Sequence, residues 1–337
     1  MRKMVCRMAG GLVLAVSPLA AGCVTAAAEP GGAAVQAELA PLEAADWALV
    51  WSDEFNGTQL DRSKWLPEQS CWGGGNDERQ CYTDRPENIA VENGYLLLKA
   101  RAETFTGPAR PPEIAGDTNP QITKEYTSGK VRTRGLHAWK YGRIEVRAKV
   151  PPGQGMWPAV WMMPADDDYG RWPLSGEIDI LEAVNIGADC DTCEGNVGEN
   201  RTVSALHFGD LPPDNRLVDN KTALPDLALP SDDFHVYAVE WGEGLIRFLV
   251  DDRVHFTVTR DQWDTGSPIA SGNPNAPFDR PFYVMANLAV GGRWPERDNE
   301  KGLAPGSIPA QFALDWIRVY QCASDPETGR ACMDGRN

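Results

Sequence analysis

The sequence has little positive charge: it carries 32 Lys and Arg against 48 Asp and Glu, a formal net charge of −16. A chain this acidic lacks a basic face for nucleic acid and disfavours anionic polysaccharides, unless a local basic patch overrides the net charge. It also lacks a Gly-x-Ser-x-Gly elbow, a His-Glu-x-x-His pair, a Walker loop and a dinucleotide fingerprint, so the enzyme classes that use these motifs have no support. An uncharged ligand fits best.

No window of the sequence sustains the apolar spacing of a helix, whereas a period of two recurs. Residues 141–150 place four apolar side chains on one face and four charged ones on the other, as in a half-buried strand. Residues 89–100 form two such runs around Asn93 and Gly94, a strong hairpin signal, and residues 245–258 repeat the arrangement around two aspartates.

Many short strands separated by turns predict an all-β fold, an antiparallel sandwich of the jelly-roll type. With 42% hydrophobic residues the chain can bury a core, and 33 Gly and 26 Pro supply the turns. No break in composition divides residues 46–321, which predicts one domain. Further strands are expected at residues 47–55, 129–134, 157–163, 177–184, 202–208, 234–241, 282–290 and 312–320.

The N-terminus resembles an export signal. Residues 1–22 have basic residues followed by an apolar stretch that is too short to span a membrane. Cys23 follows a lipoprotein-like segment and is the predicted lipidation site, which would anchor the chain to a membrane; ordinary cleavage near residues 25–28 is the alternative. Residues 23–45 are predicted to be a flexible tether. The chain is therefore expected in the cell envelope or secreted.

Six cysteines remain after export, which indicates disulfides, and six allow 15 connectivities. Their spacing favours Cys71–Cys81, Cys190–Cys193 and Cys322–Cys332. The second pair, Cys-x-x-Cys, would alternatively be a redox or zinc pair, but it has no βαβ context and no second close Cys/His pair. The third would close the C-terminal tail, residues 322–337.

Three carboxylates lie within six residues of a strand-like run. Glu177 and Asp179 share a face, but Glu182 has the opposite parity and would point into the core of a regular strand, where an unpaired carboxylate is costly. A β-bulge at residues 180–181 would return Glu182 to the face of the other two. The alternative is an ordinary solvated strand face.

The spacing of the three acids suits the hydrolysis of glycosidic bonds. With the bulge, Glu177 and Glu182 lie roughly 13 Å apart along the backbone. Long side chains leaning together over Asp179 permit the separation of about 5–5.5 Å that retaining glycosidases need. Because clustered carboxylates cannot all ionise freely, Glu177 is the predicted nucleophile, Glu182 the general acid/base, and Asp179 the residue that orients Glu177.

This run resembles the bulged signature of glycoside hydrolase family 16, and its surroundings resemble the bacterial laminarinase branch of that family. The similarity extends over residues 51–55, 76–80, 82–85, 126–129, 141–145, 153–164, 172–177, 287–295 and 315–320. The sequence departs from the usual laminarinase form at Cys81, which follows Gln80, and at Arg293, beside Trp294. These two departures concern fine specificity for the sugar.

The resemblance implies a concanavalin-like jelly roll with a concave cleft, and an endo-acting, retaining hydrolysis of β-1,3-glucan by double displacement without a catalytic cofactor. It also implies aromatic platforms and polar contacts for the sugar. These candidate substrate-binding residues are Asn76, Arg85, Trp157, Trp161, Trp172, His207 and Trp294. A structural Ca²⁺ held by Glu54, the carbonyl of Gly94 and Asp315 is expected away from the cleft.

The expected partner is a neutral β-glucan, and the expected state is a monomer. Alternative activities are hydrolysis of mixed-linked β-1,3-1,4-glucan and transglycosylation, since sugar instead of water can capture the covalent intermediate. A non-catalytic carbohydrate-binding sandwich is a further alternative. It needs no acidic cluster, so the three carboxylates speak against it.

Overall fold

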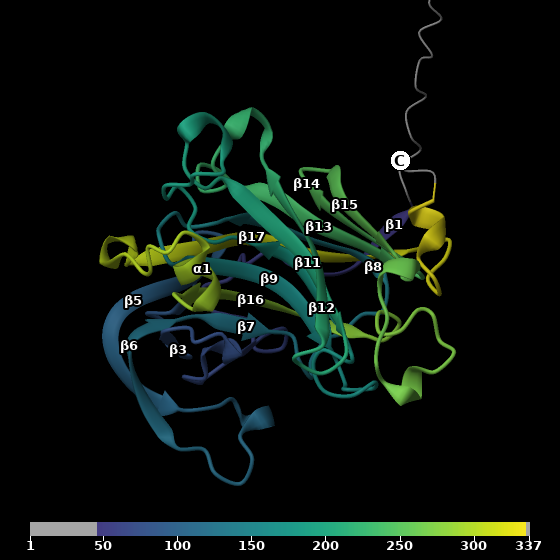
Figure 1. Cartoon of the computed structure of the whole chain (residues 1–337), viewed down its shortest axis with the longest axis horizontal. Coiled ribbons are helices and arrows are strands. Elements are labelled where there is room, and N and C mark those ends of the chain that lie inside the picture. Colours follow the sequence, from purple (N-terminus) through teal and green to yellow (C-terminus); the bar gives the residue numbers. More distant parts are fainter. Residues whose placement is uncertain (1–45, 335–337) are drawn as a thin grey trace, which may run out of the picture. The chain divides into compact units, whose positions relative to one another are not determined.

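The computed structural model describes residues 46–334, and these form two β-sheets packed face to face (Figure 1). The expected signal segment, Cys23 and the tether lie outside the described residues. The first sheet has ten strands in the order β15-β14-β13-β8-β17-β5-β6-β3, with β1 beside β17 and β4 beside β5. Its strands are β1 (Trp47–Asp53), β3 (Gln80–Tyr82), β4 (Ile89–Glu92), β5 (Tyr95–Pro108), β6 (Gln121–Ser128), β8 (Gly142–Lys149), β13 (His235–Gly242), β14 (Leu245–Val250), β15 (Arg253–Thr259) and β17 (Ala310–Cys322).

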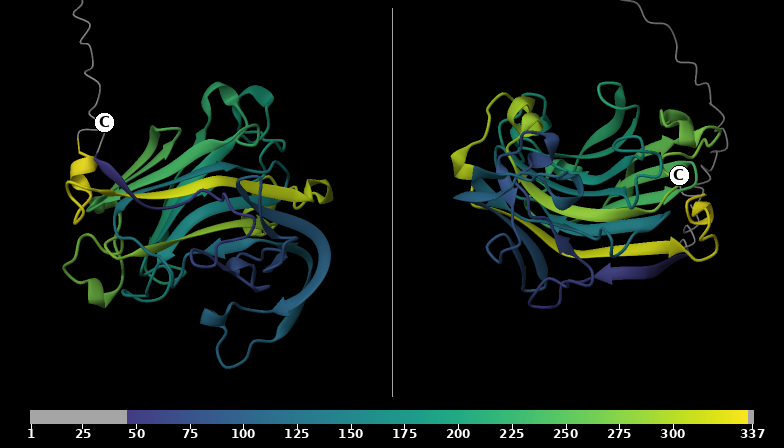
Figure 2. Two further views of the ribbon diagram at one scale, coloured as in Figure 1. Left: turned by 180° about the vertical axis from the view of Figure 1, so that it is seen from behind. Right: turned by 90° about the horizontal axis from the view of Figure 1, so that it is seen from below.

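The second sheet has seven strands in the order β12-β11-β10-β9-β16-β7-β2. They are β2 (Leu66–Pro67), β7 (Lys130–Arg132), β9 (Met156–Pro164), β10 (Glu177–Glu182), β11 (Arg201–Gly209), β12 (Asn215–Ala223) and β16 (Phe282–Val290). Figure 2 shows the long strands bending along their length. Pairing is antiparallel except between β3 and β6, which run parallel, so the all-β prediction is confirmed with one parallel pair added.

The core lies between the sheets and is built by alternation along the strands. On β8, Ile144, Val146 and Ala148 are fully buried against the second sheet, while the charged residues between them lie on the opposite face. Strand β16, in the middle of the second sheet, is buried along its whole length. One face of the second sheet therefore seals the core, and the opposite face, here called the outer face, is left for other residues.

The two predicted hairpins are present, and backbone geometry explains them. Asn93 and Gly94 between β4 and β5 have φ of +55° and +82°, and Asp251 and Asp252 between β14 and β15 have φ of +48° and +61°. Two successive positive φ values match the right-handed twist of the flanking strands. The local sequence therefore determines these turns.

Some elements were not expected. The long strands β6 and β12 have polar residues on both faces and give no clean alternation. A short helix, α1 (Arg293–Asp298), follows β16. Short 3-10 turns lie at Gly73–Gly75, Pro112–Ile114, Glu194–Asn196, Pro225–Leu227, Arg260–Gln262, Pro268–Ala270, Pro305–Ser307 and Arg330–Cys332. Within residues 46–334, no helix is long and apolar enough to cross a membrane.

Candidate active site

Strand β10 carries the three carboxylates, and its register against both neighbours shows one extra residue. Against β11, Asp179 pairs with Ala205 and Glu182 pairs with Val203, so three steps on β10 match two on β11. The register against β9 also shifts after Asp179. The bulge predicted at residues 180–181 is therefore present.

The bulge places all three acidic side chains on the outer face. Their partners on β11 are every second residue of that strand, and such residues share a face. The two bulge residues, Ile180 and Leu181, are both buried in the core between the sheets. The extra residue thus keeps Glu182 beside Glu177 instead of turning it into the core.

The strand begins after a glycine that no other residue would replace without strain. Gly176 has a φ of +85°, in the left-handed region that glycine adopts readily. A Cβ at this position would lie 2.8 Å from the ring of Phe278. This turn fixes the direction in which Glu177, the next residue, enters the sheet.

Two indole groups hold the two glutamates on the outer face. The Nε1 of Trp157 donates a hydrogen bond to Oε1 of Glu182 at 3.0 Å. The Nε1 of Trp172 donates to Oε2 of Glu177 at 2.6 Å. Each of the two glutamates therefore accepts a hydrogen bond from its own tryptophan. These two tryptophans were expected only as sugar platforms.

Burial and mutual repulsion hold protons on two of the three acids. Burial, more than the neighbouring negative charges, raises the pKa of Glu182 to about 8, although the hydrogen bond from Trp157 opposes the rise. Burial, then the charges of Glu177 and Glu182, raise the pKa of Asp179 well above its usual range. The outer face thus presents a glutamate with a raised pKa, Glu182, on the same strand as a second glutamate, Glu177.

His207 lies against the first two acids. Its Nε2 is 3.4 Å from Oδ2 of Asp179 and 3.8 Å from Oε1 of Glu177, and its ring is 6.0 Å from that of Trp172. Asp179 itself is only 2% exposed. The structure therefore brings His207 and Trp172 together at the Glu177 end of the site.

Two polar residues that the sequence analysis did not predict as site residues, Asn287 and Lys130, lie beside Trp161 on the second sheet. Asn287 accepts a hydrogen bond from Nε1 of Trp161 at 2.7 Å. Lys130, paired across strands with Asn287, has its Nζ 4.9 Å from the Trp161 ring and 3.1 Å from Glu68. No local pattern marks them, because only the pairing of β16 with β7 puts them beside Trp161.

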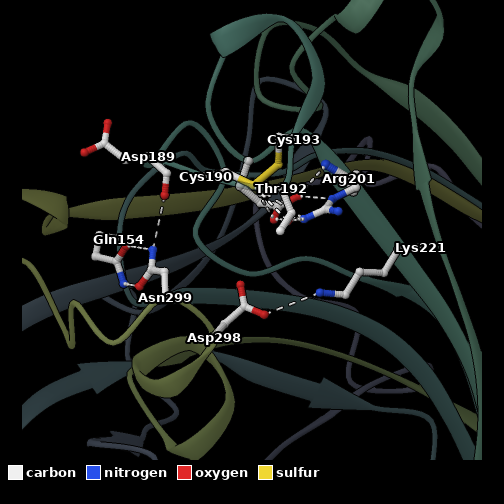
Figure 3. Close-up of a disulfide and its surroundings, with 10 residues drawn as sticks. Gln154, Asp189, Cys190, Thr192, Cys193, Arg201, Lys221, Asp298 and Asn299 are labelled. Atoms are coloured by element: carbon white, nitrogen blue, oxygen red, sulfur yellow. Dashed lines mark hydrogen bonds and ion pairs between the residues drawn. A yellow bond between two sulfur atoms is a disulfide. The ribbon is translucent and has the colours of Figure 1, made fainter.

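Helix α1 brings Trp294 to the Glu182 end. The rings of Trp294 and Trp157 meet edge to face at 5.2 Å. Lys221, from β12, lies 6.0 Å from the Trp294 ring and 3.4 Å from the carboxylate of Asp298 (Figure 3). Strand β12, at the edge of the sheet, and α1 are therefore linked at the Glu182 end of the site.

The loop after α1 is tied to a disulfide-closed loop. Asn299 and Gln154 exchange hydrogen bonds through their side-chain amides at 2.7 and 3.1 Å, and Lys301 pairs with Asp189 at 3.0 Å. Figure 3 shows Asp189 next to the predicted disulfide Cys190–Cys193, which is formed. Its sulfurs are bonded to each other, so neither thiol is free to ligate zinc in this structure.

The other two predicted disulfides are also formed: Cys71–Cys81 and Cys322–Cys332. The last closes the tail onto the body, where Met333 is fully buried and its carbonyl accepts a hydrogen bond from Arg247 at 2.7 Å.

Two further candidate sugar contacts, Asn76 and Arg85, have partners other than the three acids. Asn76 is exposed in the loop before β3, and its carbonyl accepts a hydrogen bond from the backbone of Arg293. Arg85 is engaged elsewhere: it pairs with Glu103 at 2.5 Å and donates to Asn88 at 2.9 Å. The structure therefore places Asn76 beside α1, whereas Arg85 belongs to a network on β5 and its neighbours.

The two carboxylates among the three candidate calcium ligands already pair with arginines. Glu54 accepts two hydrogen bonds from Arg318, at 3.0 and 2.8 Å, and Asp315 accepts one from Arg147 at 2.5 Å. Gly94 lies in the turn between β4 and β5. Each carboxylate already has a guanidinium as counter-charge, so a cation bound here would have to displace an arginine.

Comparison with known proteins gives one consistent result. A family model described as "Beta-porphyranase A-D, GH16 domain" matches residues 47–322. The chain is 40% identical over 281 residues to a glucan endo-1,3-beta-glucosidase A1 of Niallia circulans, covering 81% of this chain and 38% of that protein. It is 37% identical to a beta-glucanase of Rhodothermus marinus, covering 83% of this chain and 87% of that protein.

A solved structure agrees. The X-ray structure of the laminarinase from Rhodothermus marinus superposes with a TM-score of 0.63 at 34% identity, covering 81% of this chain and 97% of that one. The likeness therefore extends over both sheets and includes the strand with the three acids.

Proposed function

The chain belongs to glycoside hydrolase family 16, and from that premise we propose that it is an endo-acting, retaining hydrolase of β-1,3-glucan. Enzymes of this family need no catalytic cofactor. The observation that carries the proposal is the bulge in β10, which keeps Glu177, Asp179 and Glu182 on one face while Trp157 and Trp172 bond to the two glutamates.

In the first step, Glu177 is the nucleophile. One of its carboxylate oxygens forms a bond to the anomeric carbon as the glycosidic C–O bond breaks. Glu182, whose raised pKa of about 8 keeps it protonated at neutral pH, gives its proton to the leaving oxygen. The protonated Asp179, hydrogen-bonded to Glu177, orients the nucleophile and adds no negative charge.

In the second step, water replaces the bond to Glu177. Glu182, now ionised, takes a proton from the water. The water oxygen attacks the anomeric carbon, and the ester bond to Glu177 breaks. Two inversions leave the configuration retained. A sugar hydroxyl in place of water would give transglycosylation, so the two outcomes share every residue.

The substrate class is supported by the relatives and by the charge of the chain. The relatives above are named for β-1,3-glucan or β-glucan, and a net charge of −16 favours an uncharged polymer. The family model, in contrast, carries the name of a porphyranase. A reducing-end assay on laminarin, curdlan, lichenan, agarose and porphyran tests the choice. Laminarin should be cleaved fastest; predominant cleavage of agarose or porphyran would overturn the substrate and leave the mechanism intact.

The nucleophile is tested by Glu177→Gln. The amide cannot form the ester but keeps the shape and can still accept from Trp172. Turnover of laminarin should fall by at least about 10⁴-fold while oligosaccharide binding persists. Circular dichroism and thermal unfolding check the fold, and normal activity in this variant would refute the assignment.

The remaining proposals concern anchoring and metal. The three disulfides fit a protein that works outside the cytoplasm. We further propose that Cys23 is lipidated and that the enzyme acts as a monomer. Incorporation of labelled fatty acid that Cys23→Ser abolishes would support the anchor. The calcium site at Glu54, Gly94 and Asp315 stays a separate prediction, and the arginine partners of both carboxylates argue against it.

A further inference from the structure

The backbone of the bulge in β10 is bound by a side chain of the neighbouring strand. Ser204, on β11, lies opposite the bulge, between the partners of Asp179 and Glu182, and is only 3% exposed. Its Oγ is 2.9 Å from the carbonyl oxygen of Ile180, the first bulge residue. Because a carbonyl only accepts, Ser204 donates its single hydroxyl proton to Ile180. This bond holds the peptide group between the two bulge residues, where the regular strand pairing is interrupted.

A histidine from the other sheet contacts the same hydroxyl. The Nε2 of His255, on β15, is 3.4 Å from Oγ of Ser204. One step on β14, from Phe248 to Leu249, matches two steps on β15, so His255 is the extra residue of a second bulge. Strand β15 is the last strand of the first sheet, and β12 is the last strand of the second. His255 therefore reaches from the edge of one sheet to a residue beside β10 in the other.

The donors and acceptors of this polar group have one consistent assignment. Since Ser204 donates its only proton to Ile180, its oxygen accepts from the N–H at Nε2 of His255. The other ring nitrogen, Nδ1, then accepts from the side-chain amide of Asn220, whose Nδ2 is 3.2 Å from it and 3.1 Å from the carbonyl oxygen of His255. Burial lowers the pKa of His255 to about 4, so the ring is neutral and Nδ1 accepts at neutral pH. A single chain of hydrogen bonds therefore runs from Asn220 through His255 and Ser204 to the bulge.

This polar group lies on the side of the sheet that is opposite to the acids. Ser204 alternates along β11 with Val203 and Ala205, which are the partners of two of the acids. Its side chain therefore points away from the outer face. Asn220 pairs directly with Ser204 and shares its face. The hydroxyl does not meet a sugar bound over the acids, so any effect on the reaction passes through the backbone of β10.

We propose that Ser204, oriented by His255, is a positioning residue that holds the bulge in the form that brings Glu182 to the leaving oxygen. This inference rests on the proposed function, in which Glu182 is the proton donor. Glu182 follows the bound carbonyl by two residues, so rotation of that peptide group moves its side chain. Proton transfer needs the donor within hydrogen-bond reach, and a displacement of about 1 Å costs on the order of 100-fold in rate.

The test uses two glycosides of laminaritriose that differ in their need for a proton. The dinitrophenyl group leaves as a stable anion without protonation, whereas the phenyl group needs the acid. Ser204→Val and Ser204→Thr have the same shape and differ in the hydroxyl, so they separate the hydrogen bond from packing. In Ser204→Val, kcat/KM for the phenyl glycoside should fall about tenfold or more, and kcat/KM for the dinitrophenyl glycoside should stay within about twofold. Ser204→Thr should keep the wild-type ratio of the two constants.

Two further variants complete the comparison. His255→Leu removes the group that orients Ser204 and leaves the bond to Ile180, so the same selective loss should appear at about threefold. Thr133→Val removes another buried hydroxyl that donates to a carbonyl, that of His137 at 2.8 Å in the loop after β7, and should leave the ratio unchanged. Thermal unfolding of each variant checks the fold.

Three results would overturn the proposal. These are equal losses for both glycosides in Ser204→Val, which a purely structural role would give, full activity in that variant, or a Ser204→Thr enzyme with the same selective loss. In each case the wild-type enzyme still cleaves the substrates, so only this inference fails. A wild-type enzyme that cleaves neither glycoside nor laminarin would refute the proposed function itself, and this inference with it.

Discussion

At the scale of single residues, the two glutamates of the candidate site are each held by a different tryptophan. Glu182 is half-buried and accepts a hydrogen bond from the indole of Trp157, and desolvation outweighs the indole, so its pKa rises to about 8. A hydrogen bond to a carboxylate favours the ionised form. Trp157 therefore limits the rise in the pKa of Glu182, the proposed proton donor, as well as bordering the site.

The replacement Trp157→Phe should move the alkaline limb of kcat/KM, expected near pH 8, to higher pH. Phenylalanine keeps the ring but removes the N–H, so the ionised form of Glu182 loses stabilisation and its pKa rises. The pH profile of laminarin hydrolysis measures the shift. Trp172→Phe is the matched control, because it removes a donor to Glu177 and should leave the alkaline limb in place. A limb that moves to lower pH would contradict the role given to Trp157.

At the scale of elements, helix α1 carries Trp294 to the Glu182 end of the candidate site. Its position depends on the contacts of Lys221 with Asp298 and the Trp294 ring, and on the amide pair of Asn299 with Gln154. Movement of α1 would therefore alter sugar binding more than proton transfer.

Lys221→Met should raise KM for laminari-oligosaccharides by about threefold, since a partly exposed ion pair and a cation–π contact each contribute under about 1 kcal/mol. The value of kcat should stay within about twofold, because no group that handles the proton is removed. Steady-state kinetics measure both constants. Lys99→Met, which removes an exposed pair with Glu92 on the other sheet, controls for the lost charge. A large fall in kcat with unchanged KM would contradict this account.

Sequence reasoning succeeded where structure is local and failed where it depends on distant strands. The bulge follows from the parity of Glu182, and the hairpin at Asn93 and Gly94 follows from turn chemistry. Strand β12 has no apolar face of its own and is a strand only because it pairs with β11. The partnership of Asn287 with Lys130 likewise arises from pairing between segments far apart in the sequence.

At the scale of the whole molecule, arginines and disulfides join the segments. Arg318 ties Glu54, at the end of the first strand, to β17, and Arg147 ties β8 to Asp315. Cys322–Cys332 closes the tail next to β17. The sequence shows Glu54 and Asp315 but not that each pairs with an arginine. It therefore suggested a bound Ca²⁺ where the structure has arginines as counter-charges.

Removal of divalent metal should therefore leave stability unchanged. Incubation with EDTA is expected to shift the melting temperature by less than about 1 °C, since Glu54 and Asp315 each keep their arginine partner. Differential scanning calorimetry with and without added Ca²⁺ measures this. A fall of several degrees that Ca²⁺ reverses would show that the cation displaces the arginines.

The bulge in β10 has a consequence for how such a chain changes by inheritance. The loss of one codon, that of Ile180, would remove the extra residue. In the regular strand that remains, the final glutamate would follow the aspartate by two positions, so alternation alone would keep the three carboxylates on one face. An in-frame deletion of three nucleotides would thus exchange a bulged strand for a regular one without removing any of the three acids.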